Sequence, residues 1–213
     1  MARYTRQVTV GALPLSRDRI LACAVQVADR DGLDATSLRK VASELGVHVT
    51  SLYNHVPTKE ALLDGIGEEL LTRADVPVSE VAWDTWVRRF VTAMSTLAAE
   101  HPGAFEVFMR RPVQGARASA TFECALEAFN RAGLGVMESY AALKVVTIAV
   151  LGCCVEQASA DSGMTEPMTD ISRLPVNEFP VVHAVVAGGR DVDVVNTLVD
   201  VLVAGLEALV QRA

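Results

Sequence analysis

Apolar residues recur at helical spacing along most of the 213-residue chain, and the N-terminal part divides into four short segments of this kind. Ser16, Ser37 and Thr58 stand before the first, second and fourth segments, where serine and threonine act as helix N-caps. Gly32 and Gly46 follow the first and second segments, as expected of glycines that end helices. The predicted helices run from residue 17 to 31, 38 to 45, about 49 to 55, and 59 to about 74.

The rest of the chain has the same periodicity after a joint at residues 75–82, which contains Pro77. Further helices are predicted at 83–100, 102–110, 116–132, 135–160, 181–188 and 191–211, with an irregular stretch at 162–180. No segment alternates like a β-strand over a useful length. The fold class is therefore all-α, with a flexible arm at 1–15, one unit at 16–75 and a larger unit at 76–213.

The net charge of −7 is unevenly distributed. Residues 1–60 hold eight Lys/Arg against six Asp/Glu, whereas the remainder holds eleven against twenty. A basic end on an acidic body can face phosphate while the rest stays soluble. The apolar run Val145–Val155 is too short to span a bilayer, no signal peptide is evident, and the four cysteines lack metal spacing. We expect a cytoplasmic protein with buried thiols and no metal or cofactor.

The segment Leu38–Val56 has the pattern of a helix-turn-helix, whose second helix lies in the DNA major groove. Gly46 can take the left-handed conformation that the turn needs. Val47 and Leu52 are placed to enter a shared core, which leaves an acid-free polar face for solvent. Two amphipathic helices joined by a glycine turn also occur in many other helical proteins, but the composition of this face favours DNA.

Each exposed residue has a plausible contact. Asn54 can pair with adenine, and Thr50 or Ser51 can reach a base edge or a phosphate. Tyr53 and Lys59 suit phosphates, and Arg39 can reach a guanine or the backbone. The full set of predicted DNA-binding residues is Arg39, His48, Val49, Thr50, Ser51, Tyr53, Asn54, His55 and Lys59.

From Ser16 to about Leu71 the chain resembles the tetracycline-repressor (TetR) family. The motifs that carry this resemblance are Leu38-Arg39-Lys40-Val41-Ala42, Leu45-Gly46-Val47, Leu52-Tyr53-Asn54-His55-Val56, and Lys59 followed by Ala61-Leu62-Leu63. The resemblance implies nine or ten helices, dimerisation through a C-terminal four-helix bundle, and repression until an effector binds. It continues more weakly at His101-Pro102-Gly103-Ala104, Arg111-Pro112 and Leu151–Glu156.

The resemblance fails at two ligand positions. The position of the drug-contacting histidine of the tetracycline repressors corresponds here to Ala74 and Asp75. The position of their metal-binding histidine falls near Val107 and Phe108. Neither position offers an imidazole, so we do not expect a magnesium–tetracycline effector.

Aromatic and thioether side chains concentrate in the second unit, as in apolar ligand pockets. The candidate effector residues are Phe105, Phe108, Met109, Phe122, Leu126, Phe129 and Glu156. For any one of the apolar residues, ordinary core packing is the main alternative, and Glu156 could equally be a solvated residue.

The expected partners are palindromic operator DNA, a largely apolar small molecule and a second copy of the chain, paired through the helices at 135–160 and 191–211. Intrachain packing of those two helices is the alternative. A different class of function is a helical small-molecule binder that keeps the helix-turn-helix only as structure. No catalytic set of residues is evident, so we expect no enzyme activity.

Overall fold

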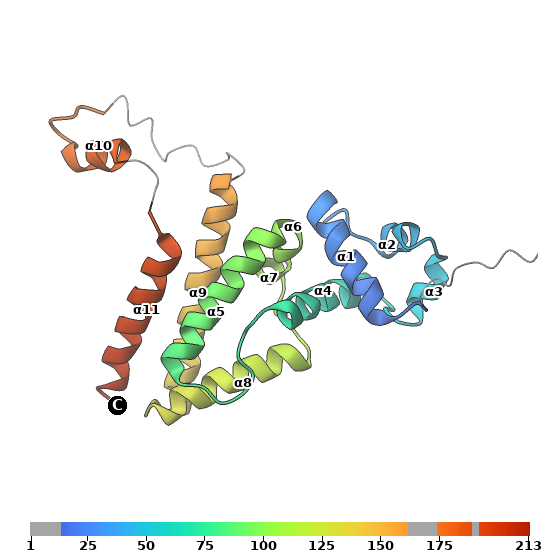
Figure 1. Cartoon of the computed structure of the whole chain (residues 1–213), viewed down its shortest axis with the longest axis horizontal. Coiled ribbons are helices and arrows are strands. Elements are labelled where there is room, and N and C mark those ends of the chain that lie inside the picture. Colours follow the sequence, from blue (N-terminus) through green and yellow to red (C-terminus); the bar gives the residue numbers. More distant parts are fainter. Residues whose placement is uncertain (1–13, 162–173, 189–191) are drawn as a thin grey trace, which may run out of the picture.

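The computed structural model describes residues 14–161, 174–188 and 192–213, and all regular structure within these ranges is helical (Figure 1). The predicted all-α class is therefore confirmed, while nearly all of the predicted arm at 1–15 lies outside the described residues. The helices are α1 (Arg17–Asp31), α2 (Leu38–Glu44), α3 (Val49–Tyr53), α4 (Lys59–Arg73), α5 (Trp83–Glu100), α6 (Pro102–Phe105), α7 (Val107–Arg110), α8 (Ala116–Arg131), α9 (Val136–Asp161), α10 (Pro180–Ala187) and α11 (Val194–Val210).

The three predicted N-caps each accept a backbone hydrogen bond at the start of a helix. The hydroxyl of Ser16 accepts from the amide of Arg19 at 3.3 Å, and that of Ser37 from Lys40 at 3.3 Å. Thr58 accepts from the amide of Ala61 at 3.0 Å. Each bond satisfies an amide that has no partner inside its own helix, which explains why the helices begin there.

The helices α1–α4 form one end of the molecule, and α4 runs from this end into the body (Figure 1). α1 packs on α4, and α2 packs on both α1 and α3. Ile20, Leu52 and Ile66 are fully buried between them. The same apolar core continues into the body through Leu70 and Trp86, so the two predicted units share one core.

The body is built on α5, which contacts α8, α9 and α11. Trp86 of α5 stacks on Phe90, with ring centroids 4.7 Å apart, and meets Phe129 of α8 edge-on at 6.3 Å. α10 stands apart from the other helices, and its described side chains are largely exposed (Figure 1).

The predicted helix at 102–110 is divided into α6 and α7 by a break at Glu106. In a continuous helix Phe105 and Val107 would point to opposite sides, whereas the break allows both side chains to be buried. The helix predicted to reach His55 ends at Tyr53, and Asn54 and His55 lie in the turn before Pro57.

α6 lies directly against the C-terminal turn of α1. A Cβ atom added to Gly103 would be 2.2 Å from the carbonyl oxygen of Ala28, so only glycine permits this approach. Asp29 completes the contact, because one carboxylate oxygen accepts the amide of Ala104 at 2.9 Å and the other lies 2.7 Å from Nδ1 of His101. The contact joins the N-terminal unit to the body.

We expect Gly103→Ala to destabilise the protein by about 2 kcal/mol, because the new methyl group meets backbone that cannot rotate away. Gly65→Ala is the matched control. Its Cβ would meet the end of the Leu21 side chain at 2.4 Å, which can move, and alanine gains up to about 1 kcal/mol of helix propensity. Urea denaturation of both variants measures the difference. Equal losses at the two positions would contradict this account of the contact.

Candidate functional site

The short helix α3 is held on the protein by one fully buried side chain, Leu52. Val47 and Val49 pack partly against the core beside it, and the amide of Val47 donates to the carbonyl of Ala42 at 3.0 Å. Gly46 has a φ of 66°, which reverses the chain between α2 and α3. These contacts fix which side of α3 faces outward.

The outward face carries the predicted polar residues. Thr50, Tyr53, Asn54, His48 and His55 are exposed, and Ser51 is half-buried. Val49 is the exception among the predicted DNA-contacting residues of this helix, because part of its side chain packs on the core. No acidic residue occurs between Gly46 and Lys59, so the face can approach a phosphate backbone without like-charge repulsion.

Two predicted cations flank this face. Arg39 is exposed in the first turn of α2, and Lys59 is exposed at the start of α4. Nζ of Lys59 donates to the carbonyl of Asp34 at 3.4 Å, a long bond that leaves most of its hydrogen-bonding capacity unused. The N-terminus of α4 adds the positive end of a helix dipole beside Lys59.

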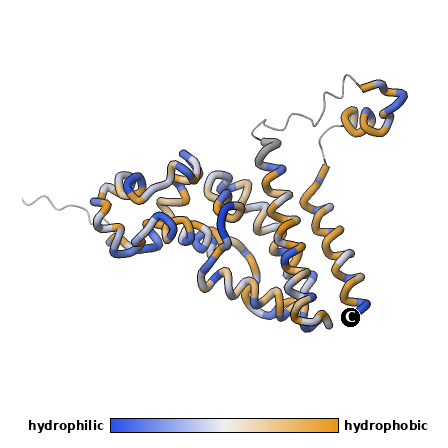
Figure 2. The backbone as a smooth tube through the Cα atoms, turned by 180° about the vertical axis from the view of Figure 1, so that it is seen from behind, coloured by the Kyte–Doolittle hydropathy of each residue, from blue (hydrophilic) through white to orange (hydrophobic). Residues whose placement is uncertain are grey.

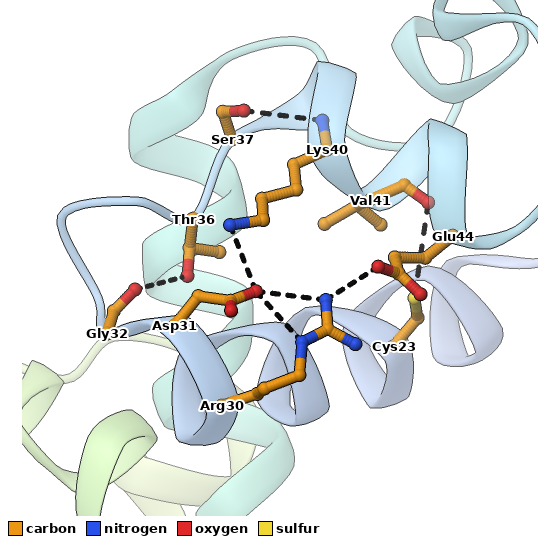
Figure 3. Close-up of polar contacts among 9 residues, drawn as sticks. All are labelled: Cys23, Arg30, Asp31, Gly32, Thr36, Ser37, Lys40, Val41 and Glu44. Atoms are coloured by element: carbon orange, nitrogen blue, oxygen red, sulfur yellow. Dashed lines mark hydrogen bonds and ion pairs between the residues drawn. The ribbon is translucent and has the colours of Figure 1, made fainter.

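An ionic cluster fastens α2 to the end of α1 (Figure 3). Oδ2 of Asp31 lies 2.9 Å from both Nη2 of Arg30 and Nζ of Lys40, and Nη2 of Arg30 lies 2.6 Å from Oε1 of Glu44. Hydrogen bonds from Arg30, then from Lys40, hold the pKa of the Asp31 carboxyl below its ordinary value. Because α3 packs on α2, the cluster helps to orient the outward face of α3. Sequence reasoning missed it.

Arginine side chains of the body also form hydrogen bonds and ion pairs with the N-terminal unit. Arg111 Nε lies 3.0 Å from a carboxylate oxygen of Asp64 in α4. Arg117 of α8 donates to three backbone carbonyls at the end of α4 and in the joint, those of Leu71, Ala74 and Val76, at 3.0–3.2 Å. Arg110 pairs with Asp34 in the loop between α1 and α2. No local sequence pattern predicts these contacts, because the two residues of each contact lie far apart along the chain.

The predicted effector residues are only partly brought together. Phe105 is buried and pairs with the half-buried Phe108 at a centroid distance of 5.1 Å. Phe129 is fully buried against Trp86 and Trp83. The other members are more accessible: Leu126 is half-buried, whereas Met109, Phe122 and Glu156 are exposed.

A groove of about 400 Å³ lies elsewhere, along α5 and the end of α4. Its lining includes three arginines, each already paired with a carboxylate: Arg73 with Glu69, Arg88 with Asp200 and Arg89 with Asp75. None of the predicted effector residues lines it.

The cysteines show no sign of reactive chemistry. All four thiols are free, and burial raises their pKa, that of Cys154 to about 11. They are therefore protonated, weakly nucleophilic thiols near neutral pH. Among the described residues, no group of three or more His, Cys, Asp or Glu side chains is arranged to hold a metal ion.

The fold and the exposed face of α3 together define a helical protein of the helix-turn-helix class, with a separate helical body. The chain matches the family of bacterial regulatory proteins described as tetR family over residues 20–66. It matches the tetracyclin repressor-like C-terminal domain over residues 77–209. The chain belongs to the tetR family, which confirms the resemblance seen in its sequence.

Two curated relatives show the level of similarity. A helix-turn-helix-type transcriptional regulator of Saccharopolyspora erythraea is 34% identical over 139 residues, which cover 65% of this chain and 59% of the relative. The transcriptional repressor DrrR1 of Streptomyces coeruleorubidus is 30% identical over 183 residues, which cover 83% and 66% of the two chains. Both alignments thus span less than two thirds of the relative's own length.

The structure is also similar to solved ones. Apo ActR from Streptomyces coelicolor superposes with a TM-score of 0.77 at 25% identity, covering 95% of this chain and 99% of ActR. ActR in complex with actinorhodin gives a TM-score of 0.76 at the same identity, covering 92% and 99%. The similarity therefore extends over the whole of ActR.

The ionic cluster predicts a specific acid sensitivity. Because the folded-state pKa of Asp31 lies below the ordinary 3.8, its stabilising effect is present above about pH 4 and is lost as the pH falls through its folded-state pKa. We expect Asp31→Asn to lower the melting temperature at pH 6, with the difference from the wild type shrinking as the pH falls below 4. Glu123→Gln, which changes an exposed carboxylate of α8, is the control. A constant difference across this range would rule out the ionic explanation.

Proposed function

We propose that this chain is a dimeric, cytoplasmic repressor that reads a palindromic operator with α3 and is released by a small, largely apolar effector. The observation that carries the proposal is the acid-free polar face of α3, held outward by the buried Leu52 in a member of the tetR family. Asn54 is suited to base reading, while Lys59 and Tyr53 are suited to phosphates. Arg39, His48, Thr50, Ser51 and His55 complete the interface, with Val49 at its inner edge.

The effector part of the proposal is supported by relatives and by the body. DrrR1 is a repressor, and ActR has been solved with actinorhodin bound. Here Phe105, Phe108 and Phe129 offer apolar ring surfaces, and Leu126 also packs against the apolar core. Met109, Phe122 and Glu156 are exposed in the free chain. They join the effector site only if binding draws their side chains towards the ligand.

The dimer part is supported by apolar side chains that a single chain leaves uncovered. On α9 they include Tyr140, Val145 and Ile148, of which Ile148 is 65% exposed; on α11, Val201 is 64% exposed. Figure 2 shows α11 as largely hydrophobic and α9 as hydrophobic over much of its described part. Val136–Gln157 of α9 is long and apolar enough to cross a membrane by length and composition, but α9 packs on α5, α8 and α11. We assign its exposed side to a second copy of the chain.

Release requires that the effector bind two arrangements of the dimer with different affinity. Two routes lead from the body to α3. One passes from α6 to α1 through Gly103 and Asp29, and the other passes along α4, whose far end is held by Arg117. An effector that shifts α6 or the end of α4 would change the spacing of the two recognition helices in the dimer. The coupling cannot exceed the difference between its affinities for the two arrangements.

The direct test is selection of DNA from a genomic pool by the purified protein at about 150 mM salt, because phosphate contacts are salt-dependent. We expect a palindromic site. Asn54→Ala should weaken binding by about tenfold or more and relax preference at one position in each half-site. If no sequence is enriched, a structural role for the helix-turn-helix replaces the proposal.

A charge-matched pair of variants tests the phosphate contact. Lys59→Ala should weaken binding to all sequences alike and reduce the salt slope by about one for each half-site. Arg212→Ala removes the same charge from the exposed C-terminal end of the described chain and should leave the slope unchanged. If the two variants have equal slopes, Lys59 is not at the interface.

The dimer face predicts that Val201→Glu converts the dimer to monomers, because a charge buried without a partner in an apolar interface costs several kcal/mol. Val78→Glu introduces the same change at an exposed valine of the joint, outside this face, and should leave the dimer intact. Analytical ultracentrifugation distinguishes the two results. A Val201→Glu protein that remains dimeric would place the interface elsewhere.

A further inference from the structure

The groove along α5 and the end of α4 has no part in the function proposed above. Its volume of about 400 Å³ lies within the range of about 300–1,000 Å³ that is typical of small-molecule sites. None of the predicted effector residues or DNA-binding residues lines it. The groove is therefore a separate candidate site, and its lining indicates which chemistry it would accept.

Arginine side chains are concentrated at one end of the groove. Residues 61–213 hold only eleven Lys/Arg against twenty Asp/Glu, and three of these eleven, Arg73, Arg88 and Arg89, line the groove. Arg73 lies in the last turn of α4, and Asp75, two residues later, brings that end of α4 to Arg89 of α5. A positive cluster of this kind on an acidic body attracts anions.

The two arginines of α5 keep much of their hydrogen-bonding capacity for a ligand. Nη2 of Arg89 donates to Asp75 at 2.5 Å, whereas Nη1 of Arg88 lies 3.6 Å from Asp200, beyond hydrogen-bonding distance. Both carboxylates are largely exposed, at 87% for Asp75 and 77% for Asp200. Exposed ion pairs contribute little to stability, and each guanidinium has five N–H donors. An anionic ligand can therefore displace these carboxylates with little loss of stability.

The groove continues from the arginines over an apolar floor. Arg89, Ala93 and Leu97 follow one another at intervals of four residues, so they form a row along α5. Ala93 and Leu97 are buried and form the floor, while Thr92 and Thr96 are exposed at its rim. Eight positions separate Arg89 from Leu97, which is about 12 Å along a helix axis. The groove thus joins a cationic end to an apolar strip.

Acidic residues at both ends limit the charge of the ligand. Asp75 lies beside the arginines, and Glu100, also in the lining, is exposed three positions beyond Leu97. A second anionic group on the ligand, or the second charge of a phosphate, would therefore meet a like charge. A carboxylate carries a single charge and matches the fork of a guanidinium with two parallel hydrogen bonds. The apolar strip favours an aliphatic chain attached to that carboxylate.

We propose that the groove is a second ligand site, which binds an aliphatic monocarboxylate with its head group on Arg88 and Arg89 and its chain over the apolar floor. The ligand carboxylate takes the place of that of Asp75 on Arg89. An exposed ion pair within the chain is thereby exchanged for one that also buries an apolar chain. Neither DNA nor the predicted effector residues take part, so the site does not depend on the proposed function.

The test compares octanoate with octylamine, which has the same number of carbon atoms and the opposite charge. Binding of each probe to the full chain is measured by isothermal titration calorimetry at neutral pH. We expect octanoate to bind at least about tenfold more tightly than octylamine, because hydrogen bonds between charged groups contribute that much to affinity.

Two ion pairs of the joint provide matched variants. Arg89 pairs with Asp75, Arg131 of α8 pairs with Glu80, and the two arginine side chains are equally exposed, at 41%. Arg89→Gln should weaken octanoate binding about tenfold, whereas Arg131→Gln, outside the groove, should leave it unchanged. Asp75→Asn removes the competing carboxylate and should strengthen octanoate binding about two- to fivefold. Glu80→Gln removes the same charge from the joint and should have no effect.

A steric variant tests the position of the chain without a change of charge. Thr96→Trp places an indole at the rim of the groove from an exposed position, and should weaken octanoate binding about tenfold because the ring occupies the apolar strip. Ser119→Trp makes a similar change at an exposed position of α8, outside the groove, and should leave octanoate affinity unchanged.

Three results would overturn the proposal: equal binding of octanoate and octylamine, equal effects of Arg89→Gln and Arg131→Gln, or no octanoate binding at millimolar concentration. Equal binding of the two probes would show that the protein only adsorbs alkyl chains. The variants change side chains at the surface, so their melting temperatures should stay close to that of the wild type, which checks that they fold. Because no measurement uses DNA, a failure here leaves the proposed function intact.

Discussion

The contact between Gly103 and the backbone of α1 is the constraint on which the rest of the architecture depends. A side chain at Gly103 would overlap the Ala28 carbonyl, so α6 could not approach α1 closely enough for Asp29 to accept the amide of Ala104. Without that approach, the N-terminal unit would be connected to the body mainly through α4. With that approach, the four-residue helix α6 connects α1, which supports α2, to the aromatic side chains around Phe105.

The N-terminal unit is attached to the body at two different ends, so a small motion of the body can rotate the N-terminal unit. Asp29 attaches α1 to α6, and Arg117 attaches the end of α4 to α8 through three carbonyls. If both attachments moved together, the unit would translate with little change in orientation. If one moves and the other holds, the unit turns, and α3 turns with it because Leu52 locks it to the shared core. In the regulator that we propose, an effector that acts on α6 or α8 alone would therefore change DNA binding more than one that moves the whole body.

The local features of the fold were predictable from the sequence, and the long-range ones were not. Ser16, Ser37 and Thr58 cap helices because capping needs only neighbours within three residues, and Gly46 marks its turn for the same reason. The division of residues 102–110 depends on burying both Phe105 and Val107, which the helical pattern alone does not show. Asp29 was missed because its partner His101 is 72 positions away.

The candidate sites divide in the same way. The face of α3 was predictable, because one buried leucine and a short helix determine which side is outward, although the partial burial of Val49 was not foreseen. The effector region was harder, because aromatic content does not distinguish a core from a pocket. Phe129 is packed in the core, while Phe122 and Met109 are exposed. The spacing of these aromatic residues along the chain does not separate the two cases.

The uncovered apolar side chains of α9 and α11 have a physical meaning. A chain selected only for solubility as a monomer would carry polar residues at exposed positions such as Ile148 and Val201. Apolar residues at these positions favour association, and a second copy of the chain covers them in the dimer that we propose. An effector then regulates the proposed dimer only if it binds the two arrangements of the dimer with different affinity, since a ligand with equal affinity for both cannot shift the balance between them.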